Sequence, residues 1–170
     1  ESSVLFRREF SARFEDRLLM LLCRKTYRFR NDFFSIDYEL SNKNTEACLF
    51  RFCTNSEIIA APIFEDHRFE LLHHRESKAL DLRSQAFFET VDGIGLSNVR
   101  KAERVLIRSD LPFSLLAKPN FLKKPSVSPQ VMDVPSDSLM FEGFSIGIGW
   151  DLSIPAEGTA FFSLSVHLEH

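Results

Sequence analysis

The stretch of sequence that decides the fold is residues 159–168, TAFFSLSVHL. Its alternation places four apolar residues on one face: Ala160, Phe162, Leu164 and Val166. A period of two is typical of a half-buried β-strand. We expect a second strand over 139–148 and a C-terminal β-hairpin formed by the two. Because an isolated hairpin of this size is marginally stable in water, it should be integrated into a sheet with the preceding residues.

Residues 34–40 show the same alternation. The apolar face is made of Phe34, Ile36, Tyr38 and Leu40. The opposite, solvated face carries Asp37 and Glu39, a spacing that would suit the carboxylate pair of a glycosidase. A charged outer face of a sheet accounts for these two residues equally well.

A further hairpin is predicted over 68–83. Residues 68–73 and 78–83 alternate, and a polar run containing His74 joins them. We expect Phe69 and Leu71 to face the core. The segment 45–64 fits either a short helix in its first half or an edge strand in its second half, where Pro62 would exclude a central strand.

Two helices are expected beside the strands. The helical spacing is carried by Phe10, Phe14, Leu18, Leu21 and Leu22. This pattern predicts an N-terminal amphipathic helix over 11–23, and Ser97 is placed to cap a helix over 98–107. The sequence therefore predicts an α+β fold with a mainly antiparallel sheet, an N-terminal amphipathic helix and one or two further helices.

The length of 170 residues suits one domain. We expect this domain to span 1–167. Five of the seven prolines fall within 110–138, which we interpret as a proline-rich strap or long loop inside the domain. The final residues, 168–170, resemble the start of an expression tag.

Phenylalanine dominates the aromatic residues, with 18 Phe against two Tyr and one Trp. Phe buries a large apolar area and has no polar group, so it serves packing or an apolar surface. Neighbouring residues of a strand point to opposite faces, so one Phe of each tandem pair should leave the core. We take Phe33, Phe88 and Phe161 as candidates for an apolar binding surface. The expected partner is a second copy in a homodimer, another protein or a small apolar ligand.

The net charge of −3 argues against a nucleic-acid partner. No apolar run reaches the length of a membrane span, and acidic residues dilute the basic face of 10–24, so we expect no membrane contact there. The three cysteines lack the spacing of a zinc site, and we expect a cytoplasmic protein without metal or cofactor.

Ser145 is the sharpest catalytic candidate. It lies in Gly143-Phe144-Ser145-Ile146-Gly147, which matches the nucleophile-elbow pattern, and Asp151 and His167 follow in the usual order. The glycines and Pro155 that follow disfavour the helix this motif requires.

His73 and His74 are the other catalytic candidates. They superficially resemble a metal-binding cluster together with Glu65, Asp66, His67 and Glu76. His67 and His73 would lie about 20 Å apart in a strand, so these two histidines cannot share a metal ion. No constellation is complete, and the sequence favours a non-catalytic binding or protein-interaction module with a Phe-rich groove or dimer surface. The alternative is a small hydrolase that uses Ser145 or a site centred on His73 and His74.

Overall fold

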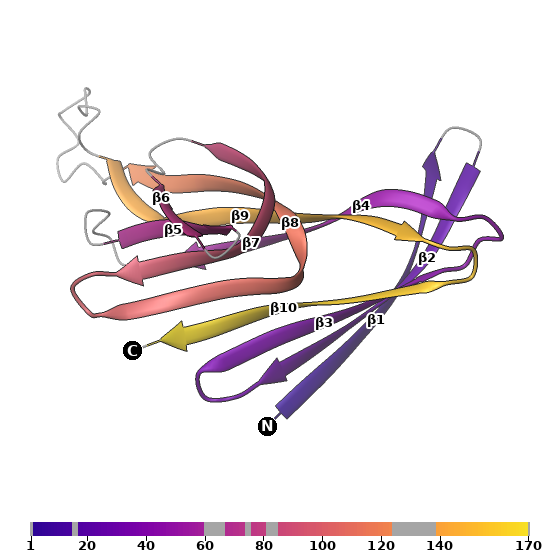
Figure 1. Ribbon diagram of the computed structural model, residues 1–170, viewed down its shortest axis with the longest axis horizontal. Coiled ribbons are helices and arrows are strands. Elements are labelled where there is room, and N and C mark those ends of the chain that lie inside the picture. The colour runs from indigo at the N-terminus through magenta and orange to yellow at the C-terminus, as the bar shows by residue number, and fades with distance from the viewer. Residues whose placement is uncertain are drawn as a thin grey trace, which may run out of the picture.

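In the computed structural model, the chain is built from β-strands (Figure 1). The structure describes residues 2–14, 17–59, 67–73, 76–80, 85–123 and 139–169. The strands are β1 (Ser2–Phe14), β2 (Arg17–Phe29), β3 (Phe33–Asn42), β4 (Cys48–Ile59), β5 (His67–His73), β6 (Glu76–Leu80), β7 (Ala86–Asn98), β8 (Glu103–Lys123), β9 (Leu139–Ile154) and β10 (Thr159–Glu169). No helix occurs among these residues. The predicted α+β class is therefore wrong, and the described part of the chain is all-β.

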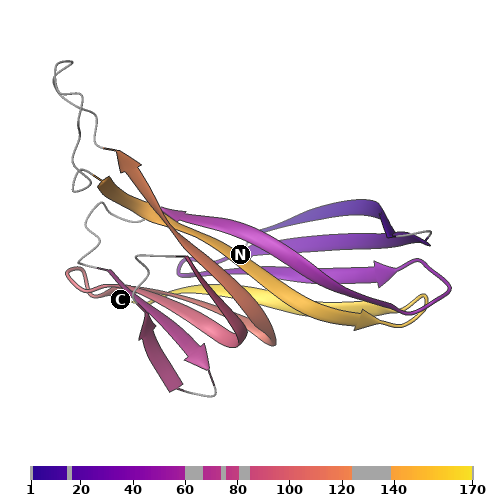
Figure 2. The same cartoon turned by 90° about the horizontal axis from the view of Figure 1, so that it is seen from above.

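The strands form one antiparallel sheet that folds over itself. Its main order is β1-β2-β3-β10-β8-β7-β5-β6, and β9 joins β8 and β4 beside this path. Strand β8 pairs with β10 up to Ser109 and with β9 from Ser114 onward. Pro112, which lacks a backbone N–H, lies at this change of partner. Figures 1 and 2 show how strongly β7 and β8 curve, so that β4 and β9 cover one face of β3 and β10.

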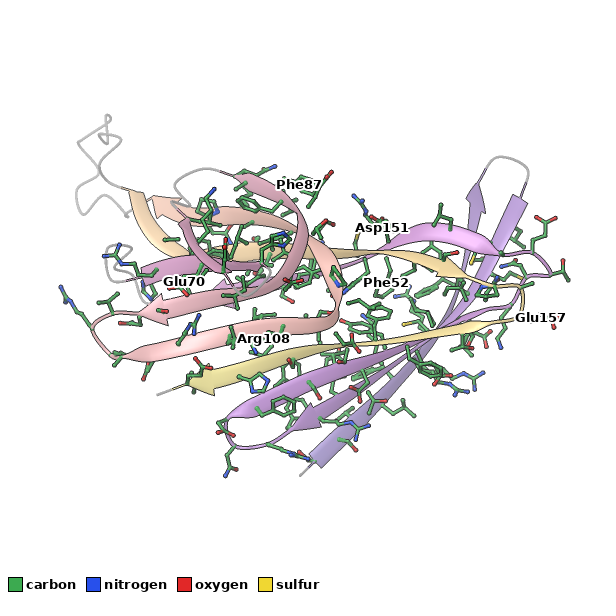
Figure 3. All side chains as sticks on the ribbon, viewed as in Figure 1. Phe52, Glu70, Phe87, Arg108, Asp151 and Glu157 are labelled. Carbon is green, nitrogen blue, oxygen red and sulfur yellow. The ribbon has the colours of Figure 1, made fainter. Side chains whose placement is uncertain are left out.

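Aromatic rings fill the space between the two layers. Phe162 on β10 stacks on Tyr38 of β3, with ring centroids 4.9 Å apart, and lies 4.9 Å from Trp150 of β9. Phe52 of β4 contacts Tyr38 and Phe162, and Figure 3 shows it between β9 and β10. Tyr38, Trp150 and Phe162 are almost completely buried. The expected packing role of Phe is confirmed here.

The predicted N-terminal helix is wrong, because residues 2–29 form the β1–β2 hairpin. Three consecutive residues, Leu21 to Cys23, are buried, which hides the period of two. The side-chain amide of Asn44 accepts a hydrogen bond from the backbone N–H of Met20 and donates one to its backbone carbonyl, so the segment after β3 packs over this part of β2. Pairing along β2 and β3 therefore overrides a helix-like pattern of leucines.

The helix predicted over 98–107 is also wrong. Strand β7 ends at Asn98, whose Oδ1 accepts hydrogen bonds from the backbone N–H groups of Arg100 and Lys101. Asn98 thus closes a turn rather than capping a helix, since Asn side chains stabilise turns in this way. Strand β8 follows from Glu103.

Most described residues of the segments 45–64 and 110–138 are in strands, whereas 45–47 precede β4 and belong to no strand. Residues 48–59 form β4, whereas 60–64 lie outside the described residues. Within the proline-rich stretch, 110–123 belong to β8, and 124–138 lie outside the described residues.

The two predicted hairpins have different outcomes. Strands β5 and β6 pair as expected, with Phe69 opposite Leu80, and Phe69 and Leu71 are buried. The C-terminal strands exist, but the described residues show no pairing of β9 with β10. Strand β9 pairs with β4 and β8, and β10 pairs with β3 and β8. The predicted C-terminal hairpin is therefore wrong, because its two strands lie in different layers.

Candidate functional site

A groove of about 300 Å³ lies on the outer face of β1, β2, β3 and β10. We call it the Phe161 groove. Its lining includes Leu5, Arg24, Arg28, Asp37, Glu39 and Phe161. The strand register creates this set, because Arg24 and Phe161 both lie directly opposite Glu39, one on each side of β3. Asp37 and Glu39 share this face, as their spacing predicted.

Two arginine–carboxylate pairs fix the polar groups of the groove. Arg24 Nη1 donates to both carboxylate oxygens of Glu39, at 3.1 and 3.3 Å, and Arg28 Nε donates to Asp37 Oδ2 at 2.7 Å. All four side chains are partly exposed. Such pairs contribute little to stability, but they hold their groups in place. A guanidinium has five N–H donors and a carboxylate has about four acceptor positions. The bonds within the two pairs use fewer donors and acceptors than these groups have.

Phe161 supplies the apolar part of the groove. Its side chain is 70% exposed, whereas the neighbouring Phe162 is 2% exposed. The prediction that Phe161 leaves the core is therefore confirmed. An exposed ring among hydrogen-bonding groups offers both a flat apolar surface and directional contacts.

The other two aromatic candidates lie elsewhere. Phe33 is partly buried on the same face as Phe161, with its ring centroid 4.7 Å from that of His167. Phe88 packs against the core, and its neighbour Phe87 is the exposed member of that pair. Figure 3 places Phe87 well apart from β10.

The catalytic candidates lie on different strands. Ser145 is in the middle of β9, and its hydroxyl exchanges hydrogen bonds with the Asn120 side chain at 2.9 and 3.2 Å. His167 is on β10 and pairs in register with Phe33. His73 ends β5, with Nδ1 4.0 Å from Asp92 Oδ2, and His74 lies outside the described residues. Within the described ranges, no group of three metal-ligating side chains gathers.

A larger cavity of about 440 Å³ lies beside β4, β7, β8 and β9. Arg51 donates two 2.7 Å hydrogen bonds to Asp151 there, which lower the pKa of Asp151 and raise that of Arg51. Thr90 adopts a left-handed φ of 56° at an irregularity of β7, a strained conformation for a β-branched residue. The aromatic rings of this cavity, Phe113 and Trp150, are buried, so they cannot stack on a ligand. We call this the Arg51 cavity.

Sequence reasoning missed Arg24 and Arg28. Both residues lie beyond the end of the helix predicted over 11–23. The available signal was the polar alternation of Arg24, Thr26 and Arg28. If this segment is read as a strand, its basic residues share one face, as the acidic residues Asp37 and Glu39 do on their own strand.

No protein-family model matches this sequence, and no curated protein sequence matches it. In the part of the chain that the structure describes, no helix has the length and hydropathy that a membrane span requires.

Solved structures share the fold at low sequence identity. A protein of Escherichia coli K12 described as an aldose 1-epimerase is 9% identical, with a TM-score of 0.66 over 98% of this chain and 65% of that one. A galactose mutarotase-like protein from Lactobacillus casei is 12% identical, with a TM-score of 0.63 over 99% and 70%. The 4-alpha-glucanotransferase of Thermococcus litoralis is 14% identical, with a TM-score of 0.62 over 99% of this chain and 21% of that one.

These likenesses show the fold. The chain has the all-β architecture of mutarotase-like proteins, and it spans about two thirds of the first protein's length and about one fifth of the glucanotransferase. A binding module is compatible with this fold, whereas nothing in the comparisons specifically supports a hydrolase.

Proposed function

We propose that the chain is a non-catalytic carbohydrate-binding module whose ligand lies in the Phe161 groove. The observation that carries the proposal is the 70% exposure of Phe161 directly opposite Glu39, which Arg24 holds in place. Small-molecule sites combine an apolar or aromatic surface with a few fixed polar groups. A sugar ring matches this combination, because its C–H groups can lie on the aromatic face and its hydroxyls can both donate and accept.

The charge of the groove favours a neutral sugar. Its two arginines are balanced by two carboxylates, each at hydrogen-bonding distance. An anionic ligand such as a phosphate would meet Asp37 and Glu39 as like charges, which disfavours binding.

The comparisons support the proposal indirectly. Structures with this fold include proteins whose names refer to sugar or glucan chemistry. One of them is the 4-alpha-glucanotransferase, in which this fold makes up only part of the chain. We therefore choose maltoheptaose, a linear α-glucan, as the first probe and galactose as the second.

Titration calorimetry tests the proposal. We expect maltoheptaose or galactose to bind the wild-type chain, and Phe161→Ala to weaken the affinity by about tenfold or more, equivalent to about 1.4 kcal/mol. The matched control is Phe87→Ala, because Phe87 is also exposed, at 52%, but lies outside the groove. Binding that Phe161→Ala leaves unchanged would contradict the proposal.

The exposed Phe161 would also suit the homodimer surface considered from the sequence. Sedimentation of the wild type and Phe161→Glu separates the two possibilities. The carbohydrate proposal expects the same sedimentation coefficient for both, whereas a dimer built on Phe161 would dissociate in the variant.

A further inference from the structure

We propose that the ligand is a linear oligosaccharide that runs from the Phe161 groove along β10 to a second aromatic contact; this inference rests on the carbohydrate-binding function proposed above. The second contact is the pair formed by Phe33 and His167, whose ring centroids are 4.7 Å apart. The two residues lie directly opposite each other in the register of β3 and β10.

The pair and Phe161 lie on one face of the sheet. His167 follows Phe161 by six residues along β10, and an even spacing in a strand keeps side chains on the same side. At about 3.3 Å per residue, the two contacts are about 20 Å apart. A single sugar ring cannot reach both, whereas a chain of several rings can.

The surface between the two aromatic contacts is polar. On this face β10 carries only Ser163 and Ser165, two small and partly buried residues. Asp37 lies opposite Ser163 on one side. On the other side β8 contributes Asp110, whose Oδ1 accepts a 2.7 Å bond from the Ser163 backbone, and Arg108, whose backbone carbonyl accepts a bond from the Ser165 hydroxyl. Figure 1 shows β3 and β8 flanking β10. Arg108 is exposed and lies directly opposite Ser165. A chain laid along β10 would therefore meet hydroxyl, carboxylate and guanidinium groups between its two aromatic contacts.

Two contacts on one ligand make affinity depend on ligand length. When one end of a chain is held at Phe161, the other end reaches the second contact at a high effective concentration. A short sugar gains only the first contact. The ratio of the affinities for a long and a short oligosaccharide thus measures whether both contacts are used.

The test compares maltose with maltoheptaose by calorimetry under the same conditions. The wild type should bind maltoheptaose at least about tenfold more tightly than maltose. His167→Ser, which extends the serine pattern of β10, and Phe33→Ala should bring this ratio toward one. Phe161→Ala should weaken both sugars, and Phe87→Ala should leave the ratio unchanged.

The outcomes separate the two proposals. Equal affinities for maltose and maltoheptaose, or a ratio that His167→Ser and Phe33→Ala leave unchanged, would overturn the linear ligand while the groove still binds sugar. Retained maltose binding shows that the variants are folded. If the wild type binds neither maltose nor maltoheptaose, the linear ligand is overturned as well.

Discussion

Replacing Phe162 by alanine is expected to lower the free energy of unfolding by about 3–5 kcal/mol. The side chain is 2% exposed, and its ring packs on Tyr38 and Trp150 from the two layers of the fold. Removing it leaves a cavity where β10 meets β9, and the surrounding rings cannot close such a cavity completely. Urea unfolding of the wild type and the variant measures the difference.

Phe161→Ala is the matched control, because Phe161 is the adjacent residue of the same strand. With most of its side chain in solvent, its removal should change the free energy of unfolding by no more than about 0.5 kcal/mol. Equal losses for the two variants would contradict the orientation of β10 on which the binding proposal depends.

Asn42→Ala should cost about 2–3 kcal/mol, although it removes no apolar surface of note. Asn42 is fully buried at the end of β3. Its Nδ2 donates to the carbonyls of Glu46 and Pro155 at 2.8 and 2.9 Å, and its Oδ1 accepts from the backbone of Asn44 at 2.9 Å. One side chain therefore connects the segment after β3 to the turn before β10, and its loss leaves buried polar groups without partners.

Asn42→Asp tests the same site with almost the same shape. The new carboxylate would face carbonyl oxygens in a buried site, so its pKa should rise above the unfolded value of about 3.9. The loss of stability should be smallest below that value and should grow as the pH rises through the folded pKa. Thermal unfolding between pH 4 and 7 measures this trend, and Asn55→Ala, at an exposed position of β4, serves as the control. A loss that does not depend on pH would contradict the assignment of the Asn42 contacts.

The sequence predicted the strands whose two faces differ in environment. Residues 34–40 and 159–168 have one buried and one solvated face, so their side chains alternate. The alternation is lost at Leu21 to Cys23, which are buried on both faces, so this strand resembled a helix. Strand β8 resembled a loop, because it passes between layers and contains Pro112 and Pro119.

The candidate site was predicted in part for the same reason. Phe161, Asp37 and Glu39 were identified because their strands alternate clearly. Arg24 and Arg28 could not be placed beside them, since only the register of β2 against β3 brings these charges together. That register depends on long-range pairing, which local patterns do not encode.

The most direct test of the central claim is a titration of the isotope-labelled chain with maltoheptaose, followed by NMR of the backbone amides. The proposed function predicts that the largest chemical-shift changes gather at Phe161, Glu39 and Arg28, with none at Arg51 and Asp151. Changes that gather instead around the Arg51 cavity would contradict the assignment of carbohydrate binding to the Phe161 groove.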